Sequence, residues 1–200
     1  MDFQESKTKT NLARSFAAEC QEGARYQFMA KKAQAEGYEY MSALIRTLAH
    51  NEMAHAERFY QEIIKHGGNQ TQNIEICAGY PFKDGELEEV LRLEAKNEKM
   101  SSESIYPKFA DEARDEGFKE VADLFDMISR VEESHEHTLI HLADSLKCNC
   151  LYKTKSGEGA FKCDNCGTII LDRMAPKICP LCQMGQGYYR IDFSMWPTTE

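Results

Sequence analysis

The sequence of 200 residues has no long apolar run, no leader-like start and no excess of basic side chains. Because no window holds eighteen consecutive apolar residues, we expect no membrane span. Residues 1–5 are acidic and polar and do not resemble a secretory signal, so we expect a cytoplasmic protein. The formal net charge of −9 argues against a nucleic-acid partner, which requires clustered Lys and Arg.

Cysteine, in contrast, is plentiful and concentrated at one end of the chain. Six of the eight cysteines lie in residues 148–200, which carry six Lys or Arg against five Asp or Glu. Residues 1–147 therefore carry nearly all of the negative charge. In an intracellular chain, paired cysteines are more often metal ligands than disulfides. Carboxylates that are buried together can also bind cations.

Apolar or small residues recur every three or four positions in four long segments, which predicts four helices. The first two run over about residues 10–36 and 38–66. A connection of 17 residues, 67–83, follows and can span roughly 55–60 Å. A 30-residue helix is only about 45 Å long, so the connection can cross the whole bundle. The pattern predicts an all-α, ferritin-like four-helix bundle with a long crossover between its second and third helices.

The third predicted helix starts near Asp84, which we expect to be its N-cap. Pro107 is expected to bend it locally. Gly117 marks a break, and the fourth predicted helix continues to about residue 147. Tight turns at Gly37 and Gly117 make consecutive helices antiparallel.

Charged or imidazole side chains interrupt the apolar stripes of all four predicted helices. Each Glu-x-x-His pair, on the second and fourth helices, projects from one helix face. Buried carboxylates need a compensating charge, and two divalent cations balance four of them. Di-iron bundles use one Glu from each of two helices and Glu-x-x-His from each of the other two, and mixed oxygen and nitrogen ligands favour iron or manganese over zinc. The predicted di-iron ligands, which are also the predicted catalytic residues, are Glu19, Glu52, His55, Glu98, Glu132 and His135.

Two alternatives concern this predicted site. A single Glu-x-x-His motif usually belongs to a solvated helix face, but two of them matched by single Glu residues on the other helices favour a metal site. Tyr26 and Tyr106 are expected near the site. They either hydrogen-bond to ligand carboxylates or are core aromatics.

Two Cys-x-x-Cys motifs predict a second metal site near the C-terminus. The four sulfurs of Cys163, Cys166, Cys179 and Cys182 suit tetrahedral coordination of zinc or of one iron. Spacing alone favours zinc. The neighbouring di-iron site favours iron, because an iron held by four thiolates can relay electrons.

The remaining pattern divides the chain into three parts. We expect a ferritin-like di-iron domain at 1–147, a linker at 148–159 and a small four-cysteine iron domain at 160–200, which the family resemblance given below makes rubredoxin-like. Cys148 and Cys150 lie in the expected linker. They are a redox pair, extra metal ligands or reduced thiols, and we expect reduced thiols.

Over essentially its whole length, the sequence resembles the rubrerythrins. The segment 105–110 is similar to the family's third-helix signature, and the Cys163 to Cys182 pattern is similar to its rubredoxin-like domain. The helical motifs that carry the resemblance are Ala18-Glu19, Glu52-Met53-Ala54-His55-Ala56 and Glu132-Glu133-Ser134-His135-Glu136.

The resemblance implies a non-haem peroxidase that reduces hydrogen peroxide to water and protects cells from oxidative stress. It implies two non-haem irons and one four-thiolate iron per chain. Electrons would come from NADH or NADPH through a reductase or rubredoxin, and pass through the four-cysteine iron to the di-iron pair. It also implies a head-to-tail homodimer.

One position departs from the family pattern. Counted back from Tyr106, the family's third-helix Glu falls on Glu98, and a second Glu normally follows three residues later, where this chain has Ser101. That carboxylate competes with the second-helix His for one iron, so we hypothesise that His55 stays bound in both oxidation states. Glu94, one turn earlier, can compensate as a base beside the ligands. In an alternative register, Glu94 is itself the ligand.

Two competing functions remain at this stage. A ferritin-like iron-handling or ferroxidase protein would form a large hollow assembly, and the appended cysteine domain argues against it. A binding bundle with a structural zinc ribbon would be colourless and contain zinc only.

Overall fold

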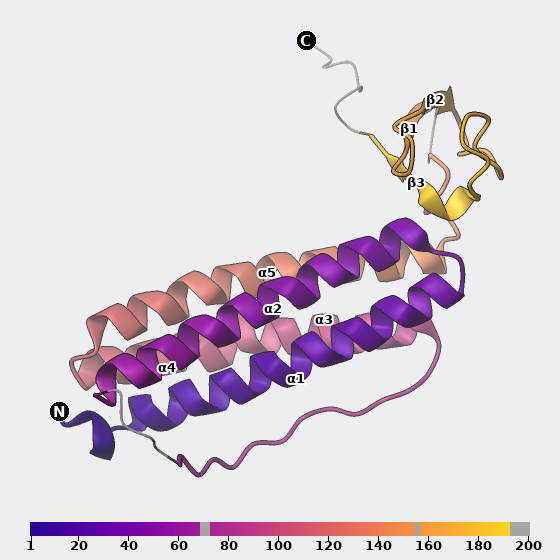
Figure 1. The fold of residues 1–200 in the computed structure, drawn as a ribbon. Helices are drawn as coiled ribbons and strands as arrows, with labels where there is room; N and C mark the ends of the chain where they lie inside the picture. The colour runs from indigo at the N-terminus through magenta and orange to yellow at the C-terminus, as the bar shows by residue number, and fades with distance from the viewer. Residues whose placement is uncertain (69–72, 155–156, 193–200) are drawn as a thin grey trace.

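The computed structural model describes residues 1–68, 73–154 and 157–192. Its larger part is a bundle of long helices, and a small domain sits at one end of the bundle (Figure 1). After a short 3-10 turn at Phe3–Glu5, the helices are α1 (Lys7–Ala35), α2 (Glu39–His66), α3 (Leu87–Met100), α4 (Tyr106–Asp115) and α5 (Lys119–Lys147). The predicted four-helix bundle is confirmed. In the described part of the chain, no helix is long and apolar enough to cross a membrane.

Local sequence explains most of the helix ends. The Ser6 side chain caps α1 by accepting a hydrogen bond from the Lys9 N–H. Gly37 and Gly117 have φ of +85° and +89° and make the two tight turns. The expected N-cap at Asp84 is wrong, because α3 begins only at Leu87. The Asp84 carboxylate instead accepts from the Gly85 N–H at 2.9 Å and shapes a turn.

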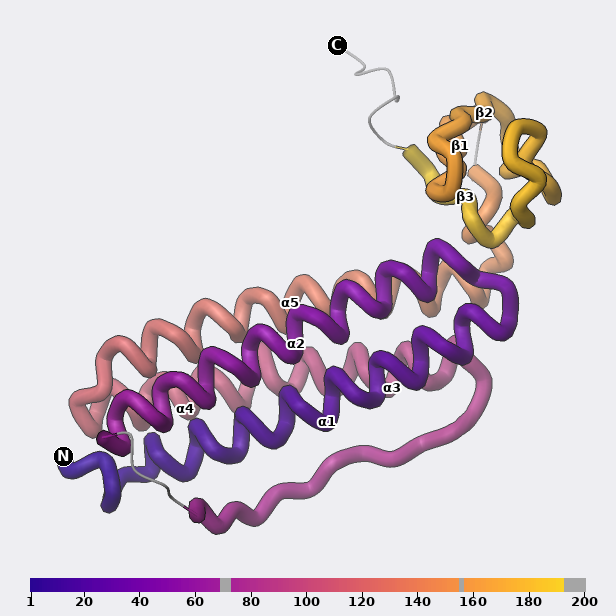
Figure 2. The backbone as a smooth tube through the Cα atoms, viewed as in Figure 1, coloured from indigo at the N-terminus to yellow at the C-terminus, as the bar shows by residue number. Residues whose placement is uncertain are grey.

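The described part of the long connection after residue 72 lies against the outside of the bundle. Residues 73–86 run along α1 from one end of the bundle towards the other (Figure 2). Ile76 shares one surface hollow with Phe16, and Phe82 shares another with Phe28. The connection therefore advances along α1 as a crossover, as its length predicts.

A widened helical turn joins α3 to α4. Residues Ser101–Ile105 form a π-helix, η2, in which the Tyr106 N–H donates to the carbonyl of Ser101, five residues back. The carbonyl of Ser102, which this shift leaves free, accepts from the Ser129 hydroxyl of α5 at 2.7 Å. The expected local disturbance near Pro107 is thus a π turn just before it.

The buried apolar side chains form two clusters along the bundle. One includes Tyr26, Met41 and Leu139 and lies toward the small domain. The other includes Leu12, Phe59 and Phe125 and lies toward the opposite end. The predicted metal-ligating residues fall between the two clusters, so the bundle holds them in a closed interior.

The small domain is a three-stranded antiparallel sheet around the four cysteines. Its strands are β1 (Gly159–Cys163), β2 (Ile169–Asp172) and β3 (Tyr189–Ile191) in the order β2-β1-β3, with a 3-10 turn η3 at Gln186–Tyr188. The segment expected to be a linker takes part in this domain. The Ala175 N–H donates to the Tyr152 carbonyl and the Thr154 N–H donates to the Arg173 carbonyl.

The small domain touches the turn between α1 and α2. The Tyr38 and Tyr152 rings stack with their centroids 6.4 Å apart. Gly187 comes so close to this turn that a Cβ atom there would overlap the carbonyl oxygen of Gly37 and lie 2.9 Å from its carbon. Only glycine fits at this contact.

Replacing Gly187 with alanine is therefore expected to displace the small domain from the bundle, because backbone atoms on the other side cannot yield. Limited proteolysis near residues 150–158 should become several-fold faster. Gly185→Ala is the matched control, since a Cβ there meets nothing within 4 Å and its φ is −67°. Equal cleavage rates in the two variants would contradict the contact.

Candidate metal centres

Four carboxylates and two imidazoles meet in the middle of the bundle. His55 Nδ1 lies 3.1 Å from both Glu52 and Glu132 and 3.5 Å from Glu19. His135 Nδ1 lies 2.9 Å from Glu52, 3.1 Å from Glu132 and 3.6 Å from Glu98. Each imidazole thus faces three carboxylates. The structure brings together all six residues that the sequence predicts.

The arrangement has two matching halves. Glu52 and Glu132 each turn one oxygen toward His55 and the other toward His135. Glu19 belongs to the His55 half and Glu98 to the His135 half, so the groups that can hold an ion are Glu19-Glu52-His55-Glu132 and Glu52-Glu98-Glu132-His135. Two carboxylates shared between two ion positions are the geometry of a bridged two-metal site.

Two tyrosines close the ends of this cluster. Tyr26 donates from its hydroxyl to Glu98, and Tyr106 donates to Glu19. Both tyrosines are almost fully buried. Each tyrosine holds a terminal carboxylate by a hydrogen bond, so the two side chains are more than core aromatics.

Burial and mutual charge shape the acidity of the cluster without metal. Burial raises the pKa of Glu19 well above its usual value, and the negative charge of Glu132 adds to the effect. Burial and the charges of Glu132 and Glu52 outweigh the opposing contact with His135 and raise the pKa of Glu98 in the same way. Burial would also raise the pKa of Glu52, but contacts with His135 and His55 lower it to about 2.

The neighbouring carboxylates also raise the pKa values of both imidazoles. Burial would lower the pKa of His55, but its contacts with Glu132 and Glu19 raise it to about 12. Contacts with Glu132 and Glu52 likewise raise the pKa of His135 to about 12. The clustered carboxylates require compensating positive charge. In the metal-free protein, protons held by the two imidazoles and by Glu19 and Glu98 reduce the negative charge instead.

Several buried polar atoms of the cluster lie 2.9–3.5 Å from an oppositely charged group of the cluster but make no hydrogen bond with it. A buried polar atom without a partner is costly, and metal ligation removes that cost. These atoms are Glu19 Oε2, Glu52 Oε1, both carboxylate oxygens of Glu132, and His135 Nδ1. Their residues belong to the two groups that can hold an ion, so the donor set fits two divalent cations.

A buried ion-pair network lies beside the cluster, and part of it was not predicted. Arg25 contacts Glu94 at 2.7 Å and Glu22 at 3.0 Å. Glu94 is therefore taken up by Arg25 and belongs to neither ion group, while Glu98 faces His135. Glu22 follows Glu19 by three residues, and this spacing is the signal that could have indicated it.

Asn51 is the other residue that sequence reasoning missed. Its side-chain nitrogen, Nδ2, lies 3.2 Å from Nε2 of His135. With the amide turned over, Oδ1 would accept from Nε2–H and leave Nδ1 free to bind a metal, the usual support of a metal-bound imidazole. Asn51 comes directly before Glu52 and lies beside the apolar stripe of α2 rather than on it. The helical periodicity therefore does not single it out.

The four cysteines of the small domain form the second cluster. The sulfurs of Cys163 and Cys182 are 3.7 Å apart, and those of Cys166 and Cys179 are 3.6 Å apart. Four thiolates held tetrahedrally at about 2.3 Å from one metal are about 3.8 Å from each other. These two distances fit one tetrahedral ion, and all four sulfurs lie within 4.8 Å of one another.

The surroundings of this cluster lower the pKa of two of the four thiols, which favours the thiolate form that binds a metal. The nearby Tyr189 hydroxyl and the Cys182 backbone N–H lower the pKa of Cys179 to about 6. The Thr168 side chain and backbone lower the pKa of Cys166. Burial raises the pKa of Cys163 to about 12, so its proton leaves only when a cation replaces it.

Comparisons with known proteins agree on one family. A family model described as Rubrerythrin matches residues 10–143. The chain is 37% identical to a rubrerythrin of Porphyromonas gingivalis over 185 residues, which are 92% of this chain and 89% of that relative. It is 36% identical to a rubrerythrin of Clostridium perfringens over 187 residues, 93% and 94% of the two chains. The chain belongs to the rubrerythrin family.

Solved structures share the fold of this chain. Nigerythrin in a partially reduced state superposes with a TM-score of 0.61 at 20% identity, covering 96% of this chain and 94% of that one. A bacterioferritin of Desulfovibrio desulfuricans, described with its diiron site in different catalytic states, gives 0.55 at 21% identity over 72% and 85%. As a rubrerythrin, the protein is a di-iron oxidoreductase with one further iron held by four thiolates.

Proposed function

We propose that this protein is a cytoplasmic, NADH-linked peroxidase that reduces hydrogen peroxide to water in oxidative-stress defence. One observation carries the proposal: a single chain holds both a buried cluster of four carboxylates and two imidazoles and a separate cluster of four cysteines. When bound, two irons held by the carboxylate and imidazole cluster would supply two electrons and Lewis acidity, and one iron held by the four cysteines would supply one-electron relay chemistry. Storage alone needs no such relay.

The roles of the residues follow from their contacts. We assign Glu52 and Glu132 as residues that would hold both ions, because each faces both imidazoles. We assign Glu19 with His55 and Glu98 with His135 as the ligands of the two ions. The list of catalytic and metal-binding residues is thus Glu19, Glu52, His55, Glu98, Glu132 and His135 for the pair, and Cys163, Cys166, Cys179 and Cys182 for the single iron.

Reduction of peroxide to two waters also consumes two protons. Burial, with Glu98 nearby, raises the pKa of Tyr26 well above its usual value, and burial with Glu19 nearby does the same for Tyr106. Both hydroxyls therefore stay protonated, and each holds a hydrogen at a terminal carboxylate oxygen. They orient these ligands and keep a proton next to where it is needed.

The distance between the clusters supports a homodimer. The small domain contacts the turn at Gly37, and Glu52 lies 13 residues beyond the start of α2 at Glu39. At 1.5 Å per residue the two clusters of one chain are separated by roughly 20 Å or more. A second copy in a head-to-tail dimer would bring its four-cysteine iron closer to this di-iron site. A rubredoxin or an NAD(P)H-dependent reductase would reduce that iron.

Ser101 is expected to leave His55 bound through the whole cycle. It stands three residues after Glu98, at the start of the π turn, and offers no carboxylate that could displace the imidazole. In crystals of oxidised and reduced protein, the iron near His55 should keep its bond to Nδ1. In Ser101→Glu the iron should shift on oxidation, whereas Ser104→Glu, on an exposed position of the same turn, should not change it. An iron that leaves His55 in the unaltered protein would contradict the expectation.

Steady-state turnover tests the proposed function. With a rubredoxin, its reductase and NADH, peroxide should be consumed with one NADH oxidised per peroxide. Excess ferrous iron offered to the protein should not accumulate as mineral. Ferrous iron oxidised and stored without peroxide-dependent NADH use would favour the ferritin-like function instead. Zinc in the four-cysteine site of the active protein would exclude the relay.

A further inference from the structure

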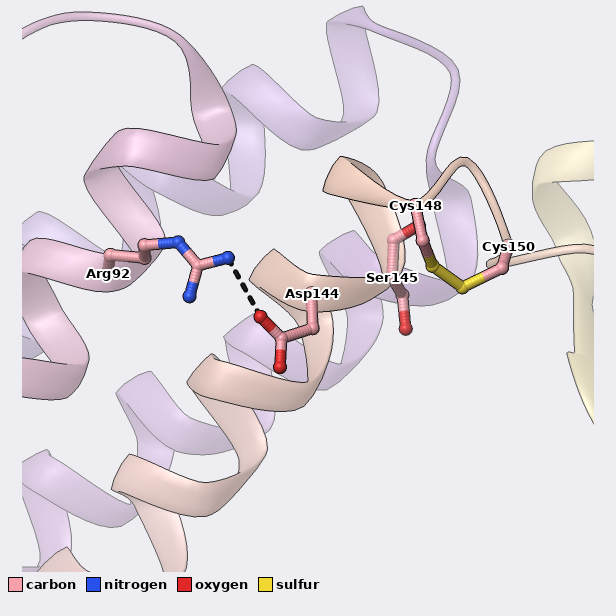
Figure 3. Close-up of a disulfide and its surroundings, with 5 residues drawn as sticks. All are labelled: Arg92, Asp144, Ser145, Cys148 and Cys150. Carbon is pink, nitrogen blue, oxygen red and sulfur yellow. Dashed lines mark hydrogen bonds and ion pairs between the residues drawn. A yellow bond between two sulfur atoms is a disulfide. The ribbon is translucent and has the colours of Figure 1, made fainter.

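Cys148 and Cys150 are joined as a disulfide at the end of α5, where reduced thiols were expected (Figure 3). That expectation is wrong. Their Cα atoms are 5.2 Å apart, within the 4.4–6.8 Å that disulfides span. This pair is separate from both metal clusters.

The backbone brings the two sulfurs together independently of the bond between them. The N–H groups of residues 148, 149 and 150 donate to the carbonyls of Asp144, Leu146 and Ser145 at 2.9–3.0 Å. Asn149 has φ of +48°, a left-handed conformation that asparagine tolerates, and it turns the chain back on itself. Arg92 of α3 pairs with Asp144 at 2.8 Å and anchors this end of α5 (Figure 3). The cysteines therefore stay adjacent when they are reduced.

Two alternative roles, a structural cross-link and a metal site, do not fit this pair. A disulfide that closes a loop of three residues restricts the unfolded chain very little, so it is a weak structural staple. Within the described residues, the groups that can hold a metal ion do not include Cys148 or Cys150, so a metal would lack further ligands. Cys148 is exposed and Cys150 is half-buried, so solvent-borne thiols can reach the bond.

We propose that Cys148 and Cys150 form a reversible two-electron dithiol–disulfide couple that exchanges with a dithiol reductant. A thiolate of the reductant attacks Sγ of the exposed Cys148, and the bond to Cys150 breaks so that Cys150 leaves as a thiolate. The second thiol of the reductant then attacks the mixed disulfide and Cys148 leaves. The reductant ends as a disulfide, and its two hydrogens appear, through solvent, on the two cysteines.

Redox equilibration of the metal-loaded full chain tests this couple. The protein is equilibrated anaerobically with graded ratios of reduced to oxidised dithiothreitol, trapped with an alkylating reagent and digested with trypsin. Cleavage after Lys147 and Lys153 isolates residues 148–153, which contain no other cysteine. Cleavage after Lys65 and Lys83 isolates Cys77, an exposed single thiol, as an internal control.

The couple predicts a tenfold change in the ratio of doubly alkylated to disulfide peptide for each tenfold change in the ratio of dithiothreitol forms. Singly alkylated peptide should not accumulate, and the Cys77 peptide should stay alkylated. Cys150→Ser should leave Cys148 alkylated once at every ratio, whereas Cys77→Ser should leave the titration unchanged. A peptide that stays doubly alkylated in the most oxidising buffer, or disulfide-bonded in the most reducing one, would overturn the proposal.

Discussion

Glu52→Gln is expected to empty the di-iron site while the four-cysteine site keeps its metal. Iron should fall from about three to about one per chain, and peroxide reduction should fall to background. Glu52 Oε1 and Oε2 lie 2.9 Å and 3.1 Å from the two imidazoles, so this one carboxylate serves both ion positions. An amide of the same shape carries no charge and cannot bridge two cations. Elemental analysis and the visible spectrum of the thiolate-bound iron measure the two sites separately.

Glu57→Gln is the matched control for this variant. Glu57 lies on the same helix but is exposed, and its contact is with Gln61 on the same surface. It should retain about three irons and full activity. Helix content measured by circular dichroism should be unchanged in both variants. If Glu52→Gln bound as much iron as Glu57→Gln, the assignment of Glu52 as a bridge would be wrong.

The metal-free protein is expected to lose stability as the pH rises from about 5 to 9, and the iron-loaded protein is not. His55 and His135 have raised pKa values, so the stability they contribute is complete below the ordinary value of 6.5 and declines as pH rises toward 12. Glu19 and Glu98 also have raised pKa values, so above 4.5 their ionisation costs stability in the fold. The lowered pKa of Glu52 matters only below about 4.5. The four groups of this cluster that titrate in this window therefore act in the same direction. Cys179 and Cys166 of the small domain have lowered pKa values and oppose them, and we expect the four groups of the buried cluster to outweigh these two thiols.

Thermal unfolding of the two forms measures this effect. Each proton that the fold holds in excess of the unfolded chain costs about 1.4 kcal/mol per pH unit, and each kcal/mol moves the Tm by about 2–4 °C. Iron replaces those protons and binds more tightly as pH rises, so the loaded protein should show a level or opposite slope. His135→Gln should flatten the slope of the metal-free protein. A Tm that rose with pH without metal would contradict the charge balance of the cluster.

Periodicity made much of the fold and of the two clusters predictable. Glu19, Glu52, Glu98 and Glu132 stand out because charge at a core position of a helix needs a partner, and the three-residue spacing to His55 and His135 fixes a shared face. The four-cysteine cluster was predictable because its ligands come from two short knuckles. In both cases local sequence places the ligands on one face of their own helix or knuckle, and the packing of these elements then brings them together.

Features that depend on the relative placement of elements could not be predicted. The pairing of Arg25 with Glu94 depends on how α1 and α3 are rotated about their axes. The contact of Gly187 with Gly37 joins residues 150 positions apart with no pattern of their own. The meeting of Cys148 and Cys150 depends on the left-handed backbone conformation of Asn149. Asparagine permits this conformation but does not require it.

Rapid mixing of the fully reduced protein with hydrogen peroxide tests most directly whether the carboxylate cluster draws its electrons through the four-cysteine iron. In the unaltered protein, we predict that the colour of the ferric thiolate-bound iron appears as peroxide disappears. In Glu52→Gln, the same colour should appear many times more slowly, although the four-cysteine site is intact. Equal rates in the two proteins, or peroxide consumption without any ferric colour, would contradict the proposed relay.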